Sequence, residues 1–220
     1  MEPYKSENRM IRRVIHLFFP TKCPFCGKLI PWEELLCSQC KKTLPYCDKI
    51  RMGADFEQCA APLYYEGDVR RSILRYKFYG KMSGLDCFGH LMAECAAEKF
   101  SGEFDAVTWV PVSHRRLKKR SYDQAKLLAE RIGAEWGVSP QKTLKKTRNN
   151  PAQSGLRDVS ARRANVLGVY QALDQENIAG KRFLLVDDIL TTGATLGEAA
   201  RILKEAGAKD VKCLTLAMTR

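Results

Sequence analysis

The chain has 220 residues, of which 45% are hydrophobic, and its 37 Lys and Arg residues outnumber 25 Asp and Glu residues to give a net charge of +12. This length and hydrophobic content are enough to form a hydrophobic core, so they exclude a protein that lacks one. They favour one sizeable domain with an accessory module. The charge indicates an anionic partner, such as nucleic acid, a phosphorylated metabolite or a membrane surface, although a solvated basic face is an alternative.

The cysteines indicate the compartment. There are nine, an odd number, and four of them form two Cys-x-x-Cys pairs. This pattern favours a metal site in a reducing compartment over a disulfide framework. The apolar run at residues 14–19 is too short for a signal-peptide core or a membrane span. The sequence therefore predicts a cytoplasmic protein without a transmembrane segment.

The chain divides into three parts. Apolar side chains at helical spacing predict an amphipathic helix within residues 1–20, packed on the body of the protein. Residues 21–58 have many turn formers and few apolar runs. We therefore expect a small module whose core cannot keep it folded without a crosslink or a structural metal ion. Strands and helices alternate from residue 59 to residue 220.

The cysteine spacing predicts a metal site that would stabilise this module. Cys23 and Cys26 form one pair, and Cys37 and Cys40 form a second pair after ten intervening residues. Four thiolates can close a tetrahedral zinc site, which has no open position and is therefore structural. Alternatives are an iron–sulfur cluster or one redox-active pair, with Cys47 as a spare ligand. The zinc either stabilises the module alone or also organises a surface for nucleic acid.

Hydrophobic periodicity predicts the elements of residues 59–220. The predicted strands are 62–67, 104–112, 143–148, 166–172, 183–186 and 211–219. The predicted helices are 67–80, 84–100, 121–137, with Ser121 as N-cap, and 195–207. This alternation predicts a doubly wound α/β domain with a mostly parallel sheet and helices on both faces.

The most informative stretch is FLLVDDILTTGATL, residues 183–196. Asp187 and Asp188 follow a buried strand, at the edge where open α/β sheets bind ligands. Gly193 permits a tight turn, and the N–H groups and threonine hydroxyls around it can cradle a phosphate. Two carboxylates suit two neighbouring sugar hydroxyls. A phosphate beside a diol describes a ribose 5-phosphate.

This stretch resembles the signature of the type I phosphoribosyltransferases, which bind phosphoribosyl pyrophosphate (PRPP) together with Mg²⁺. The resemblance implies that Asp187 and Asp188 contact the ribose hydroxyls and act as the catalytic acids that orient the sugar. It also implies that the turn from Thr191 to Thr195 holds the 5-phosphate. The implied PRPP-binding residues are Asp187, Asp188, Ile189, Leu190, Thr191, Thr192, Gly193, Ala194 and Thr195.

The same resemblance gives roles to two further segments. A basic run follows Val112, and a loop at this place takes the pyrophosphate in the family. The implied pyrophosphate-loop residues are Ser113, His114, Arg115, Arg116 and Lys119. A solvated basic face, or contact with a DNA backbone, is the alternative for this run. Residues 149–163 are expected to form a lid that excludes water from the site.

The order of the motifs narrows the family. A four-cysteine module, then VPVSHRRLKKRSYDQAKLLA, NPAQSGLRDVSARRANVLGVY and the PRPP motif resemble the ComF (ComFC) competence family. The resemblance implies a role in DNA uptake during natural transformation, at the cytoplasmic side of the membrane, with single-stranded DNA and other DNA-uptake proteins as partners. Phe25, Trp32 or Tyr46 would stack on bases, or else fill a small core. The alternatives are a metabolic phosphoribosyltransferase acting on a base or amine, and a non-catalytic PRPP sensor that binds nucleic acid.

Overall fold

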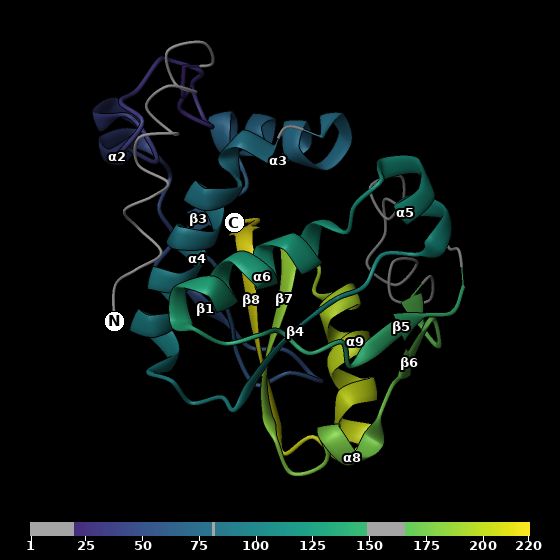
Figure 1. Cartoon of the computed structure of the whole chain (residues 1–220). Coiled ribbons are helices and arrows are strands. Elements are labelled where there is room, and N and C mark those ends of the chain that lie inside the picture. The colour runs from purple at the N-terminus through teal and green to yellow at the C-terminus, as the bar shows by residue number, and fades with distance from the viewer. Residues whose placement is uncertain (1–19, 81, 149–165) are drawn as a thin grey trace.

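The computed structural model describes residues 20–80, 82–148 and 166–220 (Figure 1). The predicted helix within residues 1–20 and the predicted lid at 149–163 lie outside the described residues. The helices are α2 (Ser38–Thr43), α3 (Gly67–Tyr79), α4 (Leu85–Phe100), α5 (His114–Arg120), α6 (Gln124–Trp136), α8 (Gln175–Ile178) and α9 (Ala194–Glu205), with a 3-10 turn at Met82–Gly84. The strands are β1 (Ile50–Arg51), β2 (Cys59–Ala60), β3 (Leu63–Tyr64), β4 (Ala106–Trp109), β5 (Leu144–Lys146), β6 (Tyr170–Ala172), β7 (Arg182–Leu190) and β8 (Asp210–Met218).

A mostly parallel sheet forms the centre of the protein. Its strand order is β1-β2-β8-β7-β4, with β3 also paired to β8, and every pairing except β1 with β2 is parallel. The two central strands, β7 and β8, are buried along most of their length because both of their faces are covered. β5 and β6 form a separate antiparallel pair.

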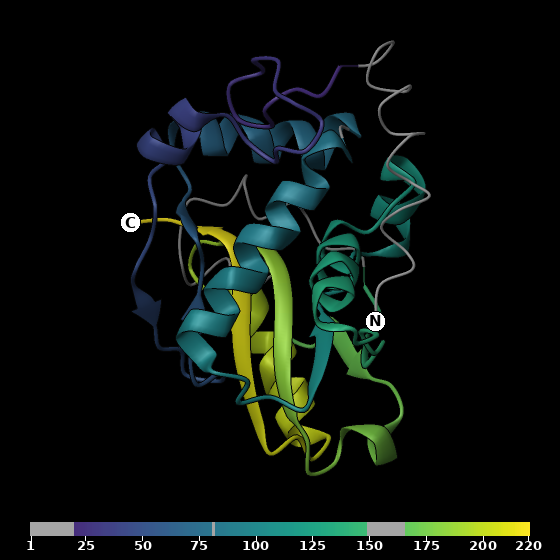
Figure 2. The same cartoon turned by 60° about the vertical axis from the view of Figure 1, so that its left-hand side comes forward.

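Helices cover both faces of this sheet. Figure 2 shows α4 crossing in front of β7 and β8, with α6 beside it on the β4 side and α9 behind the sheet. Leu184 and Val186 join the core on the α4 and α6 side, and Phe183 and Leu185 join the core beneath α9. This is the alternation that a strand with two buried faces requires. The predicted doubly wound architecture is confirmed.

Two local predictions are wrong. The basic run expected as a loop forms the helix α5, because the Ser113 side chain accepts a hydrogen bond from the Arg116 N–H and caps its start. Ser121 does not cap the next helix. It ends α5 in a left-handed conformation with φ 66°, and Asp123 caps α6 by accepting from the Lys126 N–H.

The strand before the acidic pair is also longer than predicted. β7 continues to Leu190, so Asp187 and Asp188 lie inside the strand, near its carboxyl end, rather than after it. The cause is the pairing with β8, which continues past Asp187 to Leu190 opposite Met218. Both acids are therefore held by sheet geometry and not by a loop.

The cysteine module packs directly on the α/β body, beside α3 and α4 (Figure 1). The Phe25 ring is 1% exposed and lies 5.8 Å from the Phe88 ring of α4, so it fills the core and is not available for base stacking. Ser72 and Arg75 of α3 donate hydrogen bonds of 2.6 and 2.8 Å to the Pro24 carbonyl. The module and the body share one hydrophobic core.

The first prediction concerns this contact. Phe25→Ala should lower the free energy of unfolding by about 3–5 kcal/mol, because it leaves a cavity between the module and α4. Leu29→Ala, in the same module but at a side chain that is 65% exposed, should change it by less than about 0.5 kcal/mol. Denaturant titration of the zinc-loaded protein measures both. Equal effects would show that the module does not share the core.

Candidate functional site

The two acids occupy the carboxyl end of β7, and each has a different set of neighbours. Asp188 is 8% exposed, and its Oδ2 lies 2.5 Å from Nζ of Lys77, which comes from the last turn of α3. The Asp187 carboxylate accepts a 2.8 Å hydrogen bond from the Asp188 N–H. The ion pair joins α3 to the centre of the sheet.

Further cations from separate elements surround the acids. Arg120 of α5 is half-buried and close enough to Asp188 and Arg116 for their charges to affect its pKa, which burial lowers. Lys146 of β5 is likewise near Arg116, whose charge lowers its pKa, and near Asp187, whose charge raises it. Lys77 therefore contacts an acid directly, and Arg120 and Lys146 lie near enough to the acids, and Arg116 near enough to those two cations, for their charges to interact. Such an arrangement fits a ligand with several negative charges.

Lys146 is the cation with the most perturbed environment. Its ammonium lies 5.1 Å from the centre of the Tyr170 ring and 3.4 Å from the Tyr170 hydroxyl. Burial, followed by the nearby charge of Arg116, lowers the pKa of Lys146 to about 8. An anion bound here would restore the charged form of this lysine.

The pKa of Asp187 is shifted in the opposite direction, upward. Burial, followed by the charge of Asp188, raises the pKa of Asp187 well above that of an ordinary aspartate. Lys77 and the Asp188 N–H oppose this shift but do not cancel it. The acid pair is therefore a place where a cation or hydroxyl donors would be bound favourably.

The turn that follows β7 has the features of an anion cradle. Gly193 has a φ of 80°, which disfavours any residue with a side chain, and it caps α9 without a side-chain hydrogen bond. The Ala194 N–H makes one long contact of 3.5 Å, to Oγ1 of Thr192. Arg51 of β1 fixes the turn from behind by donating to the Thr191 and Thr219 carbonyls at 3.1 and 2.6 Å.

A pocket of about 310 Å³ borders the same turn from another direction. Residues 51–56 and 190–194 line it, and neither Asp187 nor Asp188 does. Glu198 of α9 forms part of its wall, where it pairs with Arg201 at 2.9 Å and accepts from the Gly168 N–H at 2.7 Å. This pocket is not part of the cluster of acids and cations.

The predicted pyrophosphate-loop residues lie at the N-cap of α5 and along this helix, and they differ in exposure. Arg116 is half-buried, and its charge lowers the pKa of Lys146. In contrast, His114, Arg115 and Lys119 are exposed. Ser113 is 4% exposed, and its hydroxyl caps the helix. The structure thus places Arg116 near Lys146 and Arg120, and it leaves His114, Arg115 and Lys119 exposed to solvent.

Sequence reasoning missed Lys77, Arg120 and Lys146. They come from three elements, and only the fold brings them to the end of β7. A weak signal was present for Lys77, because it precedes two aromatic residues at the end of a helix closed by Gly80. Lys146 had no such signal, since two adjacent lysines in a short strand are ordinary.

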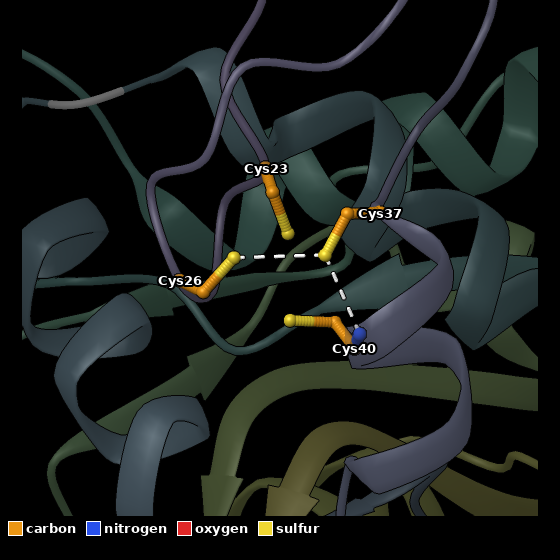
Figure 3. A group of neighbouring side chains, drawn as sticks. All are labelled: Cys23, Cys26, Cys37 and Cys40. Atoms are coloured by element: carbon orange, nitrogen blue, oxygen red, sulfur yellow. Dashed lines mark hydrogen bonds between the residues drawn. The ribbon is translucent and has the colours of Figure 1, made fainter.

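The four predicted zinc ligands form one cluster (Figure 3). All four sulfurs lie within 4.8 Å of one another, and the Cys26 and Cys37 sulfurs are 3.6 Å apart. One tetrahedral zinc with bonds of about 2.3 Å would hold its sulfurs about 3.8 Å apart, so the cluster fits the ion. Cys47 lies outside this cluster.

The backbone geometry of the two Cys-x-x-Cys turns orients the four sulfurs toward one another. The Gly27 N–H donates to the Cys23 carbonyl at 2.9 Å, and Gly27 has a φ of 78°, which closes the first turn tightly. In the second turn the Cys40 N–H donates to the Cys37 sulfur, and this bond lowers the pKa of the Cys37 thiol to about 7. A lowered pKa favours the thiolate that binds metal.

Comparisons with known proteins agree with both parts of the structure. A double zinc ribbon domain matches residues 14–68, and a phosphoribosyl transferase domain matches residues 121–220. Competence protein ComFC of Streptococcus pneumoniae is 28% identical, over 89% of this chain and 99% of its own. Competence protein F of Haemophilus influenzae is 26% identical, over 89% and 83%, and the DNA utilization protein YhgH of Escherichia coli K12 is 25% identical, over 90% and 85%.

These matches confirm the predicted fold class and the structural zinc module. In the part of the chain that the structure describes, no helix is long and apolar enough to cross a membrane.

The second prediction concerns the metal. The protein should contain one zinc per chain, and Cys37→Ser with Cys40→Ser should lose it, because two thiolates do not hold a closed site. Cys47→Ser should retain it, since Cys47 is buried but outside the cluster. Elemental analysis of the purified variants measures the zinc. Full retention in the double variant, or loss in Cys47→Ser, would contradict the ligand set.

Proposed function

We propose that the chain belongs to the ComF competence family, that it binds PRPP with Mg²⁺ and that it acts on single-stranded DNA during DNA uptake. The single observation that supports this most is the cluster of charges at the carboxyl end of β7. Two carboxylates lie there among four cations, directly before a glycine turn that opens a helix.

Each part of the cluster matches one part of PRPP. The turn from Thr191 to Thr195 would receive the 5-phosphate at the start of α9, where the helix dipole favours an anion. The carboxylates of Asp187 and Asp188 would accept hydrogen bonds from the two ribose hydroxyls. Arg116 and Lys146 carry the charge that a pyrophosphate requires.

Asp188 is already bound to a cation, the ammonium of Lys77, which supports the expectation that this end of the strand suits Mg²⁺. Asp187 and Asp188 are the residues that would hold the ion, through the sugar hydroxyls that they bind. When bound, Mg²⁺ neutralises charge on the pyrophosphate. The carboxylates themselves orient the ribose and favour positive charge at C1′.

The proposal places the protein at the cytoplasmic side of the membrane, where incoming single-stranded DNA and other uptake proteins are available. Two observations support a DNA partner. Relatives over most of the chain are named for competence and for DNA utilization. The net charge of +12 suits a polyanion, and part of it is gathered in α5.

The third prediction tests the acids. Asp187→Asn with Asp188→Asn should weaken binding of Mg²⁺–PRPP at least about 100-fold, because it removes two charge-assisted hydrogen bonds of about 1.5–3 kcal/mol each. Titration calorimetry measures the affinity, and circular dichroism verifies the fold of the variant.

The matched control is Asp105→Asn. Asp105 is an acid paired with Arg182 at the amino end of β7, away from the proposed site. This variant should bind Mg²⁺–PRPP as the wild-type protein does. Unchanged affinity in the double variant would refute the assignment of the acids.

The fourth prediction follows from the raised pKa of Asp187, which lies at about 8. A raised carboxyl pKa means that the residue is neutral below this value. In a Lys146→Met background, which removes the lysine that titrates near the same pH, Mg²⁺–PRPP affinity should therefore fall as the pH is lowered from about 9 to about 7. The dependence should be absent in Asp187→Asn, which cannot titrate. Calorimetry across this range measures it, and the same slope in both proteins would assign the effect to another group.

A further inference from the structure

Two neighbouring aromatic rings at the end of α3 are exposed to solvent. Phe78 is 57% exposed and Tyr79 is 76% exposed. Among the described residues, Tyr46 in the zinc module is the other aromatic side chain that is more than a third exposed. Scattered single apolar residues are normal on a surface, but two consecutive rings are a feature that a binding partner would explain.

These rings lie beside the most basic helix of the described chain. α5 has the sequence HRRLKKR, with five Lys or Arg residues and no acid. The Arg120 guanidinium lies over the Phe78 ring, 4.9 Å from its centre, and Lys118 and Lys119 are exposed. In Figure 1, α3 and α5 lie at the same end of the sheet, beyond the carboxyl ends of β7 and β8.

Hydrogen bonds hold the two helices in a fixed relation. The Tyr76 hydroxyl donates to the Gln124 carbonyl at 2.9 Å, and the Tyr122 hydroxyl donates to the Tyr76 carbonyl. Arg120 donates to Oε1 of Gln124 at 3.0 Å while it covers Phe78. Arg120 and Phe78 are therefore held in place before any ligand binds, which lowers the entropy cost of binding.

From this juxtaposition we propose that Phe78, Tyr79, Lys118, Lys119 and Arg120 form a stacking platform for single-stranded DNA, which we call the α3–α5 platform. The inference rests on the proposed DNA partner and specifies the surface that binds it. A single strand presents unpaired base faces to the rings and phosphates to the cations. A duplex hides its base faces, so it would use only the cations.

The platform lies next to the proposed PRPP site. Lys77, which pairs with Asp188, immediately precedes Phe78 in the last turn of α3. Its side chain reaches inward to the acids, whereas the next two rings are exposed. A strand stacked on these rings therefore passes beside the acids at the end of β7.

The first test removes the rings. Phe78→Ala with Tyr79→Ala should weaken binding of a labelled oligothymidylate about tenfold or more for each ring, with the slope of affinity against salt unchanged. Tyr46→Ala removes an exposed ring from the zinc module and should bind as the wild-type protein does. Fluorescence anisotropy at several salt concentrations measures both. Thermal melting should be unchanged because all three rings are exposed.

The second test removes charge without removing the rings. Lys118→Gln with Lys119→Gln should reduce the slope of log affinity against log salt by about 1.4, which is about 0.7 for each phosphate contact on a single strand. A 5-iododeoxyuridine oligonucleotide should crosslink to Phe78 or Tyr79 under light, and peptide mass spectrometry identifies the residue.

The outcomes separate this inference from the proposed function. If wild-type protein binds oligothymidylate and the ring variant binds equally, or if Tyr46→Ala is the variant that fails, the platform is wrong while the DNA partner stands. Tighter binding to a duplex or to RNA of the same sequence would also overturn it. If the wild-type protein does not bind DNA but binds Mg²⁺–PRPP, both the platform and the DNA partner fail, and the PRPP site stands.

Discussion

The ion pair between Asp188 and Lys77 is the contact on which the arrangement of the site depends. A carboxylate at the end of an interior strand has lost most of its water, and a cation must compensate for that loss. The last turn of α3 supplies this cation. The same contact holds the last turn of α3 against the end of the sheet, and with it the two exposed rings that follow Lys77. Electrostatic compensation in the sheet thereby shapes a surface outside it.

α3 also connects the site to the zinc module. Ser72 and Arg75, earlier in the helix, donate to backbone carbonyls of the module, and Lys77, further along, reaches the acids. A zinc ion held by these four thiolates would have no open position and therefore no direct part in chemistry. Its effect on the site would be structural, because it would order the turns against which α3 packs. A closed metal site and a ligand site thus share one rigid helix.

The sequence allowed the fold and the cysteine cluster to be predicted, because those signals are local. Hydrophobic runs marked β7 and β8, the cysteine spacing marked the zinc site, and the adjacent acids before Gly193 marked the ligand end of the sheet. The partners of the acids could not be predicted in this way. Lys77 lies more than a hundred residues before Asp188 in the chain, and only the sheet topology brings them together. The helix α5 was missed because a run of like charges disfavours a helix, and the Ser113 cap that outweighs this is one hydroxyl.

A crystal structure with PRPP and Mg²⁺ bound is the measurement that tests the central claim most directly. The account predicts the 5-phosphate at the amides of residues 193–195, the ribose hydroxyls on Asp187 and Asp188, and the Lys77 ammonium moved from Asp188 toward the ligand. PRPP bound with its ribose hydroxyls away from Asp187 and Asp188, on the side of the turn that faces residues 51–56, and with the Lys77 to Asp188 pair intact, would contradict it.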